Sequence, residues 1–265
     1  MPDAAPKIRL FVADDLGAGL RLALPKAQAH YLRHVMRCPP GTAVALFNGR
    51  DGEWRAAVEG YGKAEAVLRP AERLRPQAAE AGPWLLFAPL KRGPMELMLE
   101  KAVELGAGRL APVLTRRAVV SRLNAGRLQA IVVEAAEQCG RLTVPELAEP
   151  VALAELAADW PAGRRLIFCD EAGGAPPLAE VAAAEAGGAL ALLVGPEGGF
   201  EELERAALRA LPFVRPASLG PRILRAETAA LAGLAVLQAV AGDWRLPAEA
   251  GGEQFLRNGS AIRER

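Results

Sequence analysis

An uninterrupted apolar segment followed by a glycine-rich turn constrains this chain more than any other feature. Residues 189–194 (ALALLV) contain no polar side chain, and glycines bound them on both sides, which is typical of a strand buried in a parallel sheet. Residues 195–199 (GPEGG) then predict a turn with an open backbone, and an amphipathic segment with acids in its first turn begins at Phe200, as at a helix start. Ligands of α/β proteins bind at such strand-loop-helix junctions.

The side chains of this loop narrow the class of ligand. The loop matches neither G-x-x-x-x-G-K-[ST] nor G-x-G-x-x-G, and Glu197, Glu201 and Glu202 place negative charge where a polyphosphate needs a positive helix end. A nucleoside di- or triphosphate is therefore disfavoured. An adenosine-type ligand with a positive centre, such as S-adenosylmethionine, suits the open backbone and the carboxylates better. The alternative is a tight turn followed by ordinary helix-start acids.

The rest of the 265-residue chain predicts two domains. The first part alternates short strands with one helix that follows Pro25, which favours a small β-barrel over residues 1–75. Residues 69–83 are rich in Pro, Ala, Glu and Arg and predict a linker. Strands and helices then alternate through residues 76–248, which indicates an α/β domain with a mainly parallel sheet, and residues 249–265 form a C-terminal tail. The strands are expected at 7–12, 20–24, 42–47, 53–59, 64–69, 84–90, 110–114, 165–169, 189–194 and 213–219, and the helices at 25–37, 95–105, 123–139, 178–186, 200–208 and 226–241.

Composition excludes several classes of protein. No apolar segment reaches the length of a membrane span and the N-terminus lacks a signal-peptide pattern, so we expect a cytoplasmic protein without a membrane partner. Cys38, Cys139 and Cys169 lie far apart in the sequence and predict neither disulfides nor a metal site. The net charge of +1 argues against a nucleic-acid partner. However, residues 16–50, 105–133 and 205–226 contain arginines and no acid, which allows local positive patches.

A second glycine loop lies further along the chain. Residues 213–219 predict a strand, Gly220 and Pro221 a turn, and the next helix begins near Glu227 and Thr228. Parallel strands place their carboxyl ends at the same edge of a sheet. We therefore expect this loop and residues 195–199 to form two walls of one pocket.

Together the two loops resemble the paired signature of the 16S rRNA uridine-N3 methyltransferases, the RsmE family of the SPOUT superfamily. The motifs are residues 194–200 (VGPEGGF) and 219–229 (LGPRILRAETA). Residues 91–96, 101–106 (KAVELG) and 134–141 (EAAEQCGR) resemble family motifs in family order. The N-terminal part resembles the family's PUA-like RNA-binding barrel, with His30-Tyr31-Leu32, Val35-Met36-Arg37 and Asn48-Gly49 in the expected places. The resemblance covers nearly the whole chain.

The resemblance implies a fold that periodicity alone does not predict. The SPOUT domain has a deep trefoil knot at the C-terminal end of its sheet, whereas general connection rules favour a plain doubly wound sheet. It also implies a homodimer, a substrate in 16S rRNA of the small ribosomal subunit, S-adenosylmethionine as cofactor and no metal. The implied cofactor-binding residues are Gly195, Pro196, Glu197, Gly198, Gly199, Leu219, Gly220, Ile223 and Leu224.

Two further residues are candidates for catalysis. Uridine N3 must lose its proton before it can accept a methyl group, and Glu227, or with less support Glu197, could accept that proton. Arg225 could stabilise the charge that develops on the uracil oxygens. The alternatives are that Glu227 is an ordinary first-turn acid and that Arg225 is a solvated or phosphate-binding cation.

RNA contacts are expected from cations and polar groups in both domains, whereas Tyr31 and Met36 are expected to face the core. The predicted RNA-binding residues are Arg9, His30, Arg33, Arg37, Lys91, Gln138 and Arg141. Two other functions remain open: a SPOUT methyltransferase that acts on ribose 2′-O or on tRNA, and a non-catalytic RNA-binding ribosome assembly factor. Intact glycines at residues 198–199 argue against the latter, because a lost pocket would not need an open backbone.

Overall fold

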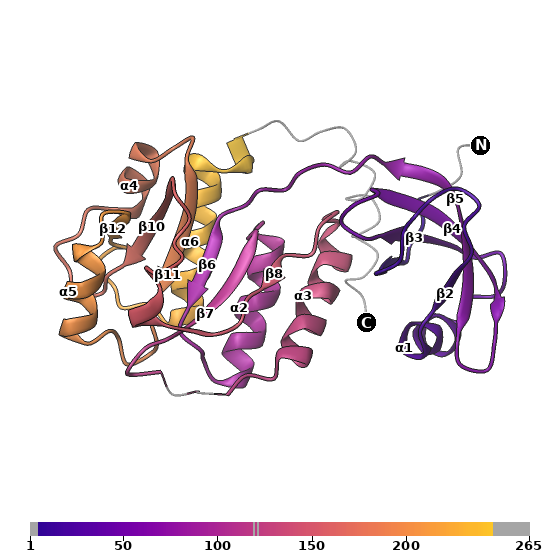
Figure 1. Cartoon of the computed structure of the whole chain (residues 1–265), viewed down its shortest axis with the longest axis horizontal. Helices are drawn as coiled ribbons and strands as arrows, with labels where there is room; N and C mark the ends of the chain where they lie inside the picture. Colours follow the sequence, from indigo (N-terminus) through magenta and orange to yellow (C-terminus); the bar gives the residue numbers. More distant parts are fainter. Residues whose placement is uncertain (1–4, 119, 121, 246–265) are drawn as a thin grey trace. The chain divides into compact units, whose positions relative to one another are not determined.

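The computed structural model describes residues 5–118, 120 and 122–245, and these residues divide into two compact units (Figure 1). The N-terminal unit contains residues 5–79 and 136–144. The C-terminal unit contains the described parts of residues 80–135 and 145–245. The grouping of residues 136–144 with the first unit has no signal in the sequence pattern. The predicted tail, residues 249–265, lies outside the described residues.

A five-stranded mixed sheet forms the N-terminal unit. The order is β1-β3-β4-β5-β2, with β1 parallel to β3 and the other pairs antiparallel. The last strand of this sheet extends to Arg75, and buried and exposed side chains alternate along it as far as the buried Pro70. The prediction of a linker is therefore wrong for residues 69–75. The strands are β1 (Arg9–Phe11), β2 (Leu22–Leu24), β3 (Ala43–Phe47), β4 (Glu53–Tyr61) and β5 (Ala66–Arg75).

The helix of this unit changes its winding half-way along. It begins as α1 (Lys26–His30) after Pro25 and continues as a π-helical turn, Tyr31–Val35. Leu32 is fully buried, but Tyr31 and Met36 are exposed, so the prediction that these two face the core is wrong. The wider turn moves them off the buried face. Arg37 then ends the segment with a left-handed φ of 53°, a conformation uncommon outside glycine.

A buried ion cluster lies at one end of the N-terminal sheet. Arg9 and Arg75 both form ion pairs with Glu53, and the Arg75 Nε to Glu53 Oε2 distance is 2.8 Å. The guanidinium carbon of Arg9 lies 3.7 Å from the centre of the Phe47 ring. Other N–H groups of the two arginines donate to main-chain carbonyl groups in the last turn of α3 and just after it, at Ala136 (2.6 Å), Gly140 (2.8 Å) and Arg141. The cluster therefore joins β1, β4 and β5 to residues 136–144.

A parallel sheet forms the centre of the C-terminal unit, as the apolar segments predict. Its order is β12-β10-β11-β6-β7-β8, which can be followed in Figure 1. The short strand β9 pairs with β7. The two-residue strands β8 and β9 are too short to leave a pattern in the sequence. The strands are β6 (Trp84–Phe87), β7 (Arg109–Leu114), β8 (Glu146–Leu147), β9 (Val151–Ala152), β10 (Arg164–Cys169), β11 (Ala189–Val194) and β12 (Val214–Ala217).

Helices cover both faces of this sheet. Side chains such as Phe168 and Leu193 pack with Phe200 and Leu208 near α5, whereas Leu192 lies against Gly233 of α6 on the other face. No helix in the described residues combines the length and apolar composition that a membrane crossing requires. The helices are α2 (Arg92–Glu104), α3 (Ala125–Cys139), α4 (Leu178–Ala184), α5 (Glu202–Ala210) and α6 (Ala226–Ala241).

Candidate functional site

Three loops follow adjacent strands at the carboxyl edge of the parallel sheet. β10 lies between β11 and β12, so the loop that begins at Asp170 lies between the two predicted glycine loops. The end of this loop is hydrogen-bonded to the start of the second glycine loop. Ser218 N–H donates to Pro176 O (2.8 Å), and Leu178 N–H donates to Ser218 O (2.9 Å). The edge therefore brings together residues 170–177, 195–201 and 218–225 (Figure 1).

The three glycines of the first glycine loop, residues 195–199, lie in different surroundings, and two of them are required by the fold. A Cβ at Gly195 would lie 2.5 Å from the Phe200 ring, so glycine there admits the ring to the core. Gly199 has a φ of +67°, and a Cβ there would lie 2.5 Å from Glu171 Oε1. Gly198 has an ordinary φ and is exposed. Glu197 is also exposed, so Gly198 and Glu197 form the accessible part of the loop.

The second loop presents an apolar side chain to solvent. Ile223 is 96% exposed, the largest exposure among the large hydrophobic residues that the structure describes. Leu219 and Leu224 are half-buried on either side of it in the sequence. Gly220 has a φ of +101° and its N–H donates to Ser218 Oγ (3.1 Å). Single exposed apolar residues are common on protein surfaces, so Ile223 supports a binding surface only together with the neighbouring glycine loop.

The predicted catalytic pair lies at the start of α6. Arg225 is the N-cap residue and is exposed, and its carbonyl oxygen accepts a hydrogen bond from Ala229 N–H (2.8 Å). Glu227 is half-buried in the first turn. Within the described ranges neither side chain forms a hydrogen bond or an ion pair. Both groups are thus available to a ligand, although Glu227 also stands where an ordinary first-turn acid would stabilise the helix.

The N-terminal unit carries an exposed surface of mixed cationic and apolar side chains, which we call the π-helix surface. The His30 and His34 rings lie 4.9 Å apart, and Arg33 lies over the Tyr61 ring at 5.7 Å. Three large apolar side chains, Tyr31, Val35 and Met36, lie among these residues, although sequence reasoning placed Tyr31 and Met36 in the core. The exposed members of the surface are His30, Tyr31, Arg33, His34, Val35, Met36 and Arg37.

Arg9 does not belong to this surface. Its side chain is 6% exposed and belongs to the buried ion cluster with Glu53. Burial lowers the pKa of the Arg9 guanidinium, and the charge of Glu53 opposes that shift. The prediction that Arg9 contacts RNA conflicts with this burial, and we assign Arg9 a structural role. The sequence placed it correctly on a strand but could not show which side of the strand it faces.

The other predicted RNA contacts lie on both units. Lys91 is the exposed N-cap residue of α2 in the C-terminal unit. Gln138 is exposed near the end of α3, and Arg141 is half-buried with its side chain donating to Thr143 Oγ1 (3.4 Å). Gln138 and Arg141 belong to the N-terminal unit. Their role in RNA binding stays a prediction.

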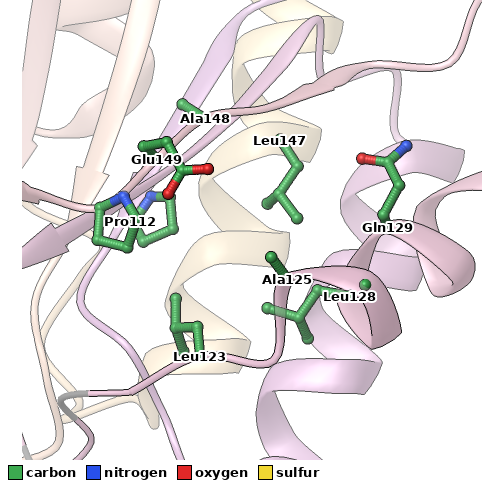
Figure 2. Close-up of a pocket in the computed structure, with 10 residues that line it drawn as sticks. Pro112, Leu123, Ala125, Leu128, Gln129, Leu147, Ala148 and Glu149 are labelled. Atoms are coloured by element: carbon green, nitrogen blue, oxygen red, sulfur yellow. The ribbon is translucent and has the colours of Figure 1, made fainter.

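A separate pocket of about 310 Å³ lies between the start of α3 and the segment that follows β8. Figure 2 shows Leu123 and Leu128 below Leu147, with Glu149 beside Pro112. None of the predicted site residues lines it, and sequence reasoning gave no signal for it. Its lining is mostly apolar, without a cluster of titratable groups, so it offers no chemistry of its own. The residues that line it are Pro112, Leu123, Ala125, Gly126, Leu128, Gln129, Leu147, Ala148, Glu149 and Pro150.

The thiol of Cys169, the last residue of β10, is chemically inert. Burial raises the pKa of the Cys169 thiol to about 12, so the thiolate that a nucleophile requires is absent at neutral pH. In the parts of the chain that the structure describes, no three His, Cys, Asp or Glu residues are grouped to hold a metal ion. The exposed charged side chains of the two glycine loops are Glu197, Arg222 and Arg225.

Comparison with known proteins identifies the family. A family model described as an RNA methyltransferase domain matches residues 81–238, and one described as an RNA methyltransferase PUA domain matches residues 24–70. A ribosomal RNA small subunit methyltransferase E from Synechocystis is 32% identical over 237 residues, which are 88% of this chain and 77% of the relative. This chain belongs to the ribosomal RNA small subunit methyltransferase E family. The Rickettsia conorii member is 28% identical over 86% of this chain and 93% of its own length.

Solved structures of similar proteins agree with this assignment to the methyltransferase E family. The Neisseria gonorrhoeae member, solved bound to S-adenosylmethionine, has a TM-score of 0.79 and 30% identity, covering 89% of this chain and 99% of its own. A Legionella pneumophila protein solved in complex with the same cofactor has a TM-score of 0.77 and 31% identity over 89% of this chain and 98% of its own. The mixed α/β architecture with a parallel sheet and an N-terminal PUA-like domain is therefore that of the family.

Proposed function

We propose that this protein transfers a methyl group from S-adenosylmethionine to N3 of a uridine in 16S rRNA of the small ribosomal subunit. The observation that carries the proposal is the meeting of residues 195–199 and 218–225 at the carboxyl ends of β11 and β12, with β10 between them. Family relatives are named as small-subunit rRNA methyltransferases, and the similar Neisseria structure holds the cofactor. An rRNA substrate also implies a cytoplasmic location.

The residues at the edge fit this cofactor. Residues 195–199 expose backbone at Gly198 without a large side chain, which suits adenosine. The exposed Ile223 offers an apolar surface to a base, and the exposed Glu197 offers a negative charge to a sulfonium. When bound, S-adenosylmethionine supplies an electrophilic methyl group. We further infer the deep trefoil knot of the SPOUT superfamily and a homodimer, both on the family resemblance.

The chain's own residues supply the proton chemistry in this proposal. Glu227 accepts the N3 proton of the uridine, directly or through water, so that the nitrogen lone pair becomes available. Arg225 donates to the uracil oxygens as negative charge develops there. Both side chains are without partners among the described residues, so binding of the uridine would not first require an ion pair to be broken.

The proposal is tested most directly on the RNA itself. Nucleosides from 16S rRNA of a deletion strain should lack N3-methyluridine, and mass spectrometry should detect it again when the protein is restored. A strain that keeps N3-methyluridine without the protein would contradict the assignment. Loss of a ribose-methylated nucleoside or of a tRNA modification in its place would point to the alternative substrates.

Gly198→Val should weaken S-adenosylmethionine binding by tenfold or more with little change in thermal stability. A Cβ at Gly198 would lie 3.4 Å from Arg117 Cβ, an ordinary contact without backbone strain, and the branched side chain of valine would reduce the space at this exposed part of the loop. Gly199→Val is a poorer test, because its φ of +67° and the contact with Glu171 would strain the fold. Calorimetry measures the affinity, and Gly60→Val, which meets no atom within 4 Å, is the control. Unchanged affinity would remove Gly198 from the pocket.

We also propose that the π-helix surface binds the RNA. Cations at Arg33 and Arg37 would pair with phosphates, and the exposed Tyr31 and Met36 would contact unpaired bases. No acid occurs from residue 16 to residue 50, so the segment does not repel a polyanion.

Arg33→Gln combined with Arg37→Gln should weaken binding of a single-stranded rRNA fragment and flatten its salt dependence. Each lost phosphate contact removes roughly 0.7 from the slope of log K against log salt for a single strand. Fluorescence anisotropy over a series of salt concentrations measures the slope. Arg73→Gln, an exposed arginine of β5, is the control. A slope unchanged from that of the wild type would show that both arginines are solvated surface charges.

A further inference from the structure

The loop after β10 carries two consecutive acids that hold the helix following the first glycine loop. Asp170 is buried, and its Oδ2 accepts hydrogen bonds from Arg209 Nε (3.0 Å) and Nη2 (2.6 Å) of α5. Glu171 is exposed, and its Oε1 lies 3.5 Å from Arg205 Nη1 of the same helix. Two ion pairs thus join the end of β10 to α5.

Glu171 differs from Asp170 because it also contacts the backbone of the glycine loop. Its Oε1 accepts a hydrogen bond from Phe200 N–H at 2.9 Å. Arg205 Nη1 donates to the carbonyl oxygen of Phe200 at 3.0 Å. Both backbone groups of Phe200 are therefore held by one ion pair. The Phe200 ring is fixed as well, since it is 1% exposed and packs edge-on against Phe168 at 5.0 Å.

These contacts fix one end of residues 195–199. The other end is the last residue of β11, Val194, whose carbonyl oxygen accepts from Ala88 N–H (3.1 Å). Between the two ends, Gly199 has a left-handed φ and its N–H donates to Pro196 O (2.9 Å). Glycine loses more conformational freedom on folding than any other residue. A loop with three glycines in five positions therefore depends on its neighbours to keep one shape. These are its fixed ends and Arg117, whose Nη1 donates to Gly198 O at 3.0 Å.

We propose that Glu171 and Arg205 are positioning residues that set the shape of the cofactor loop through the backbone of Phe200. This inference rests on the proposed function, because it assumes that residues 195–199 bind S-adenosylmethionine. Neither residue needs to touch the cofactor. Without the carboxylate, Phe200 N–H would lose its acceptor and the space beside Gly199 would open, so that the loop would sample other conformations before binding. Binding would then have to order the loop, and this loss of conformational freedom would lower the affinity for the cofactor.

The test compares two kinds of variant. One kind removes a contact with the backbone of Phe200, and the other removes a contact of α5 that does not involve Phe200. Glu171→Ala removes the acceptor of Phe200 N–H, and Glu171→Gln keeps an amide oxygen that can accept the same bond. Arg209→Met breaks the buried pair with Asp170 but leaves Phe200 untouched. Calorimetry of S-adenosylmethionine binding and steady-state kinetics are measured for each, together with the thermal unfolding midpoint.

We expect Glu171→Ala to raise the Kd and the KM for the cofactor about tenfold, with a smaller change in kcat at saturating cofactor. Glu171→Gln should stay within about threefold of the wild type. Arg209→Met should lower the unfolding midpoint more than Glu171→Ala does and leave the Kd unchanged. If Glu171→Ala does not fold, Arg205→Met replaces it, with the same expected rise in Kd.

Two results would overturn the inference while the proposed function stands. One is wild-type affinity in folded Glu171→Ala, or in Arg205→Met where that variant replaces it. The other is an equal rise in Kd for Arg209→Met, which would show that any loosening of α5 has the same effect. Failure of the wild-type protein to bind S-adenosylmethionine would instead contradict the proposed function, and the positioning role with it.

Discussion

Glu227→Gln should lower the single-turnover rate of methyl transfer by about 10²–10⁴-fold, the range typical of a lost general base. Glutamine keeps the shape of the side chain and its hydrogen bonding but cannot accept the N3 proton. Because Glu227 has no partner in the described residues, the change should leave stability and the affinities for cofactor and RNA nearly unaltered. Rapid-quench measurement with enzyme in excess over RNA separates the chemical step from product release.

The pH dependence of that rate distinguishes the two roles that Glu227 can have. If Glu227 is the base, the variant's rate should rise with pH, as uridine loses its proton to solvent. Arg225→Lys should also slow the step, because a point charge does not replace a planar guanidinium on carbonyl oxygens. Full activity of Glu227→Gln at neutral pH would make Glu227 a helix-start acid. Arg225 would then act on a uridine anion that loses its proton elsewhere.

Glu53→Gln should destabilise the N-terminal unit by about 3–5 kcal/mol, the usual cost of removing one partner from a buried ion pair. The Glu53 side chain is 9% exposed and is the carboxylate with which both Arg9 and Arg75 pair. The variant would leave two neighbouring cations without their counter-charge. Urea unfolding followed by tryptophan fluorescence measures the loss, with Trp54 as a probe on β4 next to Glu53.

The chain provides a matched control for this prediction. Glu59 also lies between two arginines, Arg21 and Arg69, but the arginine side chains are 69% and 49% exposed. Exposed pairs contribute little to stability because water screens them. Glu59→Gln should therefore leave the urea midpoint almost unchanged. Equal effects of the two substitutions would show that burial does not strengthen the Glu53 cluster.

The same cluster gives stability a pH dependence. Burial raises the pKa of Glu53, but the hydrogen bond from Arg75 and the charge of Arg9 outweigh burial, and the pKa lies below its ordinary value. The contribution of Glu53 is therefore complete above about pH 4.3, the usual glutamate pKa, and is lost as pH falls through the folded-state pKa. Urea midpoints of the wild type should fall on acidification below about pH 4. Those of Glu53→Gln should fall less.

Much of the C-terminal unit could be predicted, because its central strand β11 and its last helix α6 are almost entirely apolar. Residues 189–194 and 226–241 form β11 and α6 with the predicted bounds. A buried strand between glycines has few alternatives. The N-terminal unit was harder, since which face of a short element points inward depends on its neighbours. The π-turn at residues 31–35 moves Tyr31 and Met36 outward, and nothing in the local sequence indicates that winding.

The candidate site, too, could be predicted only in part from the sequence. The two glycine loops could be found, because glycine spacing and strand order are visible in the sequence. The role of Glu171 could not, since a glutamate in a loop is common and its contact with Phe200 joins residues 29 positions apart. The buried position of Arg9, which conflicts with its predicted contact with RNA, could not be predicted for the same reason. Its acceptors at Ala136 and Arg141 lie more than a hundred positions along the chain.

Those distant acceptors affect the order in which the protein can be completed during synthesis. The strands of the N-terminal unit leave the ribosome first, but Arg9 and Arg75 bond to carbonyl groups of residues 136–141. The ribosome must add β6, α2, β7 and most of α3 before these groups exist. Until then two guanidinium groups have Glu53 as their partner but lack their main-chain acceptors. The amino-terminal unit thus begins to fold first yet cannot reach its final set of hydrogen bonds until much of the second unit has been translated.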